Sequence, residues 1–189
     1  MENIEDAHQA THVIVTDGKI SIRRTPKLMI AMCRTPNVLS SAWLTQSAAN
    51  GTFLPVDDFM VRNDEKAEKL YNFSLKESID RIKINQLNHT LLLQGWLVFV
   101  CKGVAGNRSP PENEFRAIVE AAGGTWISSS SLLQSKKEWD PVNIIIITSD
   151  PEEKKQTSIK DVAAVLKKGA TKKNTTWLFH SILMQKLEI

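Results

Sequence analysis

The fold is decided by the segment NTTWLFHS at residues 174–181, which has a counterpart of the same design, SSAWLTQS, at residues 40–47. Each segment begins with residues whose side-chain oxygens suit a helix N-cap and continues with Trp-Leu-x-x-Ser. Trp43 and Trp177 hold the same place in the two segments. The repetition predicts two helices that occupy equivalent positions in two copies of one structural unit.

Two further pairs of segments repeat at nearly the same spacing along the chain. The runs THVIVTD (residues 11–17) and NIIIITSD (residues 143–150) are separated by almost the same interval as the two tryptophan segments. Both are rich in β-branched residues and too short for a helix, so each predicts a buried strand. A short helix is then predicted to begin at Thr25 and at Ser158, again with this separation. Three pairs at one spacing indicate two copies of a strand–helix–strand–helix unit.

The second copy is preceded by more elements. GWLVFV (residues 95–100) predicts a strand, and SPPE (residues 109–112) predicts a capping box that opens a helix. Gly123 and Gly124 end that helix before a strand at residues 125–127. The full unit is β-α-β-β-α-β-α, the pattern of a small parallel sheet flanked by helices. The sequence therefore predicts an α/β protein of two such three-layer units.

We expect three segments along the chain: a first unit (residues 1–56), a connector (57–93) and a second unit (94–189). The first unit is expected to be N-terminally truncated, because its opening strand and helix have no counterpart in the sequence. The connector predicts a helix that begins at Ser74 and places Leu75, Ile79 and Ile82 on one face. An apolar face on a connector favours packing between the two units.

The composition excludes several classes of protein. The chain has 189 residues, a net charge of +3 and two cysteines, Cys33 and Cys101. Two distant cysteines exclude a disulfide scaffold or a cysteine-based zinc module, and the scattered histidines give no metal-ligand spacing, so no cofactor is expected. The apolar runs fall short of the roughly 20 residues that a bilayer requires. We expect no membrane binding and no direct sequence-specific binding of nucleic acid.

Charge is distributed unevenly in the first unit. Residues 18–56 contain five basic residues and no acidic one, and Arg23, Arg24 and Lys27 lie close to Thr25, the predicted N-cap. A helix N-terminus favours acidic neighbours, so this placement is unfavourable for a purely structural helix. Lysine and arginine at a helix start suit a phosphate, and arginine also holds a carboxylate in two parallel hydrogen bonds. The alternative is that these are solvated surface charges.

An enzymatic interpretation depends on Cys101, which follows a predicted strand and precedes Arg108. A thiolate phosphatase loop requires five residues between the cysteine and the arginine, whereas six lie between them here. We therefore predict that Cys101 belongs to the apolar core and that the chain is not an enzyme.

The paired units, the double glycine and the tryptophan helices together resemble a tandem BRCT module, and the resemblance covers nearly the whole chain. Residues 24–28 (RTPKL), 72–78 (NFSLKES) and 95–104 look most like the C-terminal pairs of the PTIP and checkpoint-mediator type. The resemblance implies binding of phosphoserine peptides. It also implies that the first unit holds the phosphate and that the cleft between the units reads the residue three places on.

The same resemblance implies roles for individual residues. Lys27 would contact the phosphate, and Thr25 would support that contact. Arg24 would pair with the peptide backbone or with a terminal carboxylate. Lys102 and His180 are candidates for the second unit's wall of the cleft. The hydroxyl and glycine N–H that complete the family's phosphate site would precede residue 1.

The implied partner is a phosphorylated protein, above all the phosphorylated C-terminal tail of a histone variant that marks damaged DNA. The implied role is that of a nuclear adaptor that recruits repair or checkpoint factors. The alternative is a scaffold module whose protein–protein contacts do not depend on phosphate.

Overall fold

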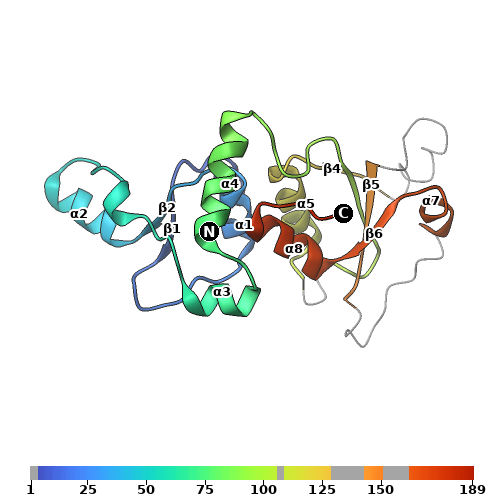
Figure 1. The fold of residues 1–189 in the computed structure, drawn as a ribbon, viewed down its shortest axis with the longest axis horizontal. Helices are drawn as coiled ribbons and strands as arrows, with labels where there is room; N and C mark the ends of the chain where they lie inside the picture. The colour runs from blue at the N-terminus through green and yellow to red at the C-terminus, as the bar shows by residue number, and fades with distance from the viewer. Residues whose placement is uncertain (1–3, 106–108, 129–142, 151–161) are drawn as a thin grey trace.

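The structure is a computed structural model that describes residues 4–105, 109–128, 143–150 and 162–189. Its elements form an elongated molecule, with α2 at one end and α7 near the other (Figure 1). The sheets are small and parallel, two-stranded in the first unit and four-stranded in the second. The predicted α/β class is confirmed. In the described ranges, no helix is both long and apolar enough to cross a membrane.

The first unit is built around one short sheet. Its elements are η1 (Ile4–Gln9), β1 (Val13–Thr16), α1 (Pro26–Met32), β2 (Val38–Ser40) and α2 (Ala42–Asn50). β1 and β2 are parallel, with Val13 paired to Val38. α1 begins where the sequence predicts, because the Thr25 hydroxyl accepts the N–H of Leu28 at 3.2 Å and Pro26 takes the first helical position.

The second unit carries the larger sheet. Its elements are β3 (Leu97–Val100), α5 (Glu112–Ala121), β4 (Thr125–Trp126), β5 (Ile144–Thr148), α7 (Ala163–Leu166), β6 (Thr171–Asn174) and α8 (Thr175–Met184). The strand order is β4-β3-β5-β6. α5 and α8 pack together through Phe115 and Phe179, whose ring centroids are 5.3 Å apart. The helix start predicted at Ser158 lies outside the described residues.

The predicted capping box at the start of α5 is wrong. Pro111 is the N-cap residue, and no side chain caps the helix. The Ser109 hydroxyl instead donates a hydrogen bond to the carbonyl of Val104, in the loop that precedes the helix. That bond orients the serine toward the loop rather than toward the free N–H groups of α5.

The connector contains η2 (Asp57–Phe59), α3 (Glu65–Tyr71) and α4 (Leu75–Leu87). Leu75, Ile79 and Ile82 are buried as predicted, in an apolar cluster with Leu28 and Met32 of α1. The cap at Ser74 forms, since its hydroxyl oxygen accepts the N–H of Glu77. The connector therefore shares a core with the first unit.

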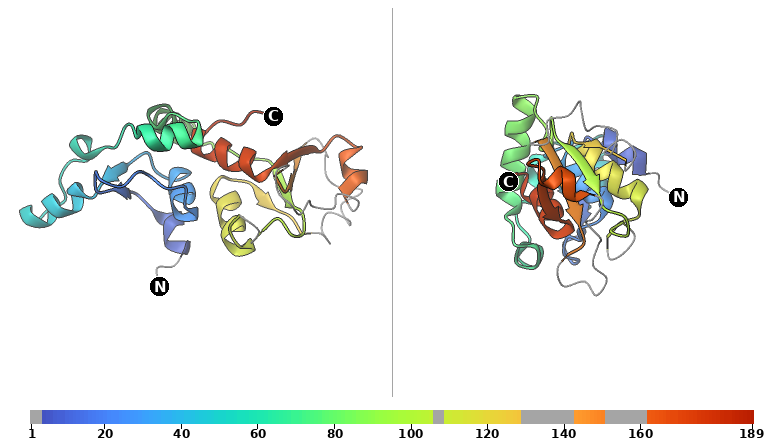
Figure 2. Two further views of the ribbon diagram at one scale, coloured as in Figure 1. Left: turned by 90° about the horizontal axis from the view of Figure 1, so that it is seen from below. Right: turned by 90° about the vertical axis from the view of Figure 1, so that its right-hand side faces the viewer.

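α1 joins the two units because, apart from its first turn with the exposed Lys27, it is apolar on every side. Leu28 and Met32 face the connector cluster, whereas Met29, Ile30 and Cys33 belong to a second cluster with α5, α8 and the four-stranded sheet. Figure 2 shows α1 against α5, with α4 alongside α8. A helix that is hydrophobic all round is a buried helix. Burial also raises the pKa of the Cys33 thiol to about 11, so this cysteine is a neutral core residue at physiological pH.

Candidate functional site

A pocket of about 540 Å³ lies where the loop before α1 meets α3. It is lined by Ile20, Ser21, Ile22, Arg23, Arg24, Thr25, Lys66, Leu70 and Tyr71. Three of these residues are cationic and none carries a carboxylate. The pocket also contains two strongly exposed apolar side chains, Ile20 (59% exposed) and Leu70 (71%). Its chemistry suits an anionic ligand with some apolar surface.

Asp64, the N-cap residue of α3, fixes the position of the pocket loop. Its carboxylate accepts hydrogen bonds from the Ser21 hydroxyl (2.7 Å), the Ile22 N–H (2.7 Å) and the Ala67 N–H (3.0 Å). Partial burial alone would raise the pKa of Asp64, but hydrogen bonds from Ala67, Ile22 and Ser21 outweigh it and lower the pKa below 3.8. The Asp64 carboxylate is therefore occupied in holding the pocket loop against α3.

The Asp64→Ala variant is expected to lose about 1–3 kcal/mol of unfolding free energy at pH 7, because it removes the helix cap and two loop hydrogen bonds. A lowered pKa means that this stabilisation is complete above pH 3.8 and is lost as the pH falls through the lowered value. Urea unfolding at pH 7 and pH 3 measures both effects. The exposed Asp58→Ala variant serves as control, and an equal loss for Asp64→Ala at the two pH values contradicts the assignment.

Arg24 lies at the junction of the first unit, the connector and the second unit. Its guanidinium carbon is 5.4 Å from the ring centroid of Tyr71 and 5.2 Å from that of Phe179. Its backbone N–H donates to the Tyr71 hydroxyl at 3.3 Å. The side chain is half-buried and lines the pocket. The structure therefore places Arg24, a residue of the first unit, beside residues of the connector and of the second unit.

Thr25 and Lys27 lie next to Arg24 along the start of α1. Thr25 lines the pocket, and its hydroxyl oxygen caps α1, so the hydroxyl hydrogen remains available to a ligand. Lys27 is exposed in the first turn of α1 and is not among the residues that line the pocket. The first turn of α1 contains no acidic residue. We call Arg24, Thr25 and Lys27, which are close along the chain at the start of α1, the cationic edge.

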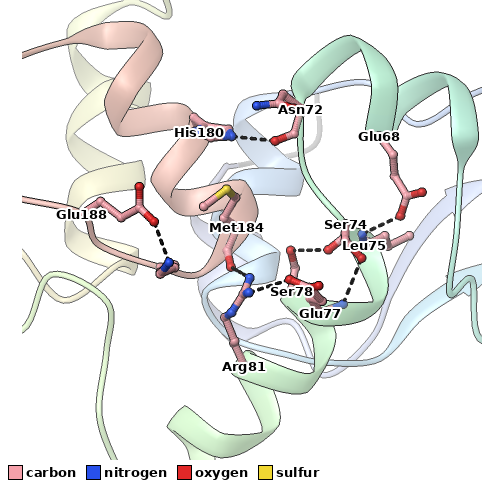
Figure 3. A network of polar contacts seen from close by, with 11 residues as sticks. Glu68, Asn72, Ser74, Leu75, Glu77, Ser78, Arg81, His180, Met184 and Glu188 are labelled. Atoms are coloured by element: carbon pink, nitrogen blue, oxygen red, sulfur yellow. Dashed lines mark hydrogen bonds and ion pairs between the residues drawn. The ribbon is translucent and has the colours of Figure 1, made fainter.

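His180 joins α8 to the connector, in the network drawn in Figure 3. Its Nε2 lies 2.7 Å from the carbonyl oxygen of Asn72, and since a carbonyl only accepts, Nε2 carries the hydrogen. One turn further on, Arg81 of α4 donates to the carbonyl of Met184 at 2.8 Å. His180 therefore lies at the junction, immediately after Phe179, and serves there as a contact to the connector.

Lys102 lies elsewhere. It is exposed beside a separate pocket of about 700 Å³ in the second unit, lined by the ends of β3 and β4 and the start of α5. The two pockets share no lining residue. The structure thus brings Arg24, Thr25 and His180 to one junction, places Lys27 in the first turn of α1 outside the pocket lining, and leaves Lys102 elsewhere. Cys101 is buried, with 4% of its surface exposed, and Arg108 lies outside the described residues.

Sequence reasoning missed three residues of the site: Lys66, Tyr71 and Phe179. Lys66 and Tyr71 belong to α3, a helix that the sequence signalled only through Asp64, an N-cap residue followed by Glu65. Phe179 belongs to the core cluster of the second unit, so nothing in its local sequence marks it as a residue of the site. Among the described residues, no group of three or more His, Cys, Asp or Glu side chains could hold a metal ion.

Comparison with known proteins identifies the family. The BRCT domain model matches residues 91–189. Human mediator of DNA damage checkpoint protein 1 is 37% identical over 123 residues, which are 65% of this chain and 5% of that protein. Mouse PAX-interacting protein 1 is 26% identical over 153 residues, which are 79% of this chain and 13% of that protein. The chain thus matches only a small part of either relative.

A solved structure has a similar fold over most of this chain. The crystal structure of the BRCT5-BRCT6 domains of S. pombe Brc1 superposes with a TM-score of 0.68 at 18% identity, covering 96% of this chain and 81% of that one. At this identity the likeness concerns the fold. BRCT domains are generally non-catalytic modules of protein interaction. Because the family model matches more than half of its residues, the chain belongs to the BRCT domain family.

Proposed function

We propose that this chain binds phosphoserine peptides, with the phosphate held by the first unit (residues 1–56). The observation that carries the proposal is a pocket that is lined by Arg23, Arg24, Thr25 and Lys66 and by no carboxylate, with Lys27 following in the first turn of α1. Lysine and arginine at a site of this kind favour a doubly charged phosphate. In this proposal Lys27 contacts the phosphate, the Thr25 hydroxyl donates to it, and Arg24 binds the peptide backbone or its terminal carboxylate.

The proposed ligand is the phosphorylated C-terminal tail of a histone, and the proposed setting is the nuclear response to DNA damage. Support comes from the similarity to mediator of DNA damage checkpoint protein 1 over 65% of this chain. A free C-terminus supplies a carboxylate within reach of a phosphoserine close to the chain end, which matches the arginine and lysine of the cationic edge. The chain acts in this proposal as an adaptor without catalytic activity.

The Lys27→Glu variant is expected to weaken binding of a fluorescent phosphoserine peptide with a free C-terminus by about 10- to 150-fold, as loss of a charge-assisted hydrogen bond costs about 1.5–3 kcal/mol. Fluorescence anisotropy titration measures the change. Lys83→Glu is the matched control, because Lys83 is exposed on α4 and its replacement changes the net charge equally. Unchanged affinity of Lys27→Glu refutes the assignment, and equal binding of the unphosphorylated peptide favours a phosphate-independent scaffold instead.

A further inference from the structure

The side chain of Arg24 is held by aromatic rings from two other parts of the chain. Tyr71 ends α3 in the connector, and Phe179 lies in α8 of the second unit. The guanidinium carbon lies 5.4 Å from one ring centroid and 5.2 Å from the other. A cation over the face of an aromatic ring is attracted by the negative potential of that face. With the Tyr71 hydroxyl also accepting its backbone N–H, Arg24 is fixed at both backbone and side chain.

Other contacts fix the positions of the Tyr71 and Phe179 rings relative to each other. Phe179 packs on Phe115, which is fully buried in the second unit. The residues that follow the rings, Asn72 and His180, are joined by the 2.7 Å hydrogen bond of Figure 3. Since each of these residues is the chain neighbour of a ring, the bond sets how the rings lie relative to each other. The place of Arg24 therefore depends on how the second unit docks against the connector.

The N–H groups of the Arg24 guanidinium are available to a ligand. In the described part of the chain, its N–H groups take part in no hydrogen bond or ion pair, although Arg24 lines the pocket. Ring faces occupy the guanidinium by attraction to its charge and leave its N–H edge available. That edge is a planar fork of donors that matches a carboxylate in two parallel hydrogen bonds.

We propose that Tyr71 and Phe179 are positioning residues that hold Arg24 ready for a ligand's terminal carboxylate, so that recognition of a free C-terminus requires both units. The inference rests on the proposed function and adds to it the residues that determine the specificity. A side chain fixed before binding loses less conformational freedom when the ligand arrives, and this gain applies only to the group that Arg24 contacts. The two rings therefore strengthen binding of the ligand's carboxylate and do not change binding of its phosphate.

The test compares two phosphoserine peptides of one sequence that end three residues after the phosphoserine, one with a free carboxylate and one with an amide. Tyr71→Leu and Phe179→Leu remove a ring and keep apolar bulk, whereas Tyr71→Phe keeps the ring. Anisotropy titration gives the preference for the carboxylate as the dissociation constant of the amide peptide divided by that of the carboxylate peptide. We expect either leucine variant to reduce this ratio by about three- to tenfold, with affinity for the amide unchanged. Tyr71→Phe should retain most of the ratio of the unaltered chain, because it keeps the ring under the guanidinium and loses only the hydrogen bond to the Arg24 backbone.

Three other results have distinct meanings. If the leucine variants weaken both peptides equally, or neither, the rings have no positioning role and the inference is overturned. If the unaltered chain binds both peptides equally well, the inference fails while phosphate binding stands. If it binds neither peptide, the proposed function fails and the inference with it. Thermal unfolding of each variant verifies its fold, and Tyr71→Leu is the more informative variant, because Tyr71 is less buried than Phe179.

Discussion

The Ile30→Ala variant is expected to unfold with about 2–5 kcal/mol less free energy than the unaltered chain, the range for a large-to-small change in a packed core. Ile30 has no exposed surface, and its cluster contains Phe115 and Ile118 of the second unit. Removing its side chain therefore leaves a cavity between the units. A single residue of the first unit should destabilise the second as well.

Urea denaturation followed by tryptophan fluorescence measures this loss, and amide hydrogen exchange in β5 shows whether it reaches the four-stranded sheet. The matched control is Ile20→Ala, the same change at a residue that is 59% exposed, where less than about 0.5 kcal/mol is expected. A loss below about 1 kcal/mol for Ile30→Ala is incompatible with α1 as a shared core helix.

Gly123→Ala is expected to cost about 2–5 kcal/mol, from two separate causes. Gly123 has a φ of +87°, which costs a residue with a side chain about 1–2 kcal/mol. A Cβ atom at this position would also lie 2.5 Å from the Cβ of Leu91, an atom close to the backbone that cannot swing aside. Such overpacking adds about 1–3 kcal/mol.

Gly51→Ala separates the two causes. Gly51 also has a positive φ, +68°, but a Cβ there would meet nothing within 4 Å. We expect this variant to show the backbone cost alone, about 1–2 kcal/mol. Thermal and urea unfolding of both variants give the comparison. Equal losses would mean that the approach of Leu91 to the double glycine has no energetic consequence.

The parts of the fold that the sequence predicted correctly are those that depend on local patterns. The β-branched runs became β1 and β5, and the Thr25-Pro26 start of α1 formed as expected. The repeated tryptophans both begin a helix directly after a parallel strand, in α2 and α8. Their surroundings differ, however: Trp43 is buried and stacks on Phe53, whereas Trp177 is half-exposed beneath Lys173. The sequence repeat therefore predicts where the two tryptophan helices lie along the chain, but not which residues pack around each tryptophan.

For the site, the charge pattern singled out Arg23, Arg24 and Lys27, and the family resemblance implied the roles of Arg24, Thr25 and Lys27. Neither contained anything about the neighbours of these residues. Tyr71 and Phe179 approach Arg24 from distant parts of the sequence, through the packing of α3 and α8. Contacts of that range follow from how the units dock and leave no local signal. Lys102 was a candidate for the second unit's wall of the cleft, and the structure places it in the lining of another pocket.

Two hydrogen bonds between the connector and α8 limit how many residues can separate Asn72 from Arg81. Asn72 and Arg81 reach His180 and Met184, which lie one turn apart on the same helix. An insertion or deletion of one residue within α4 before Arg81 would rotate that arginine by about 100° and shift it by about 1.5 Å along the axis. The guanidinium would then point away from Met184 while Asn72 stayed in place. Exposed positions between Asn72 and Arg81 therefore tolerate substitution. The number of residues between them, in contrast, is fixed by the distance between their two partners on α8.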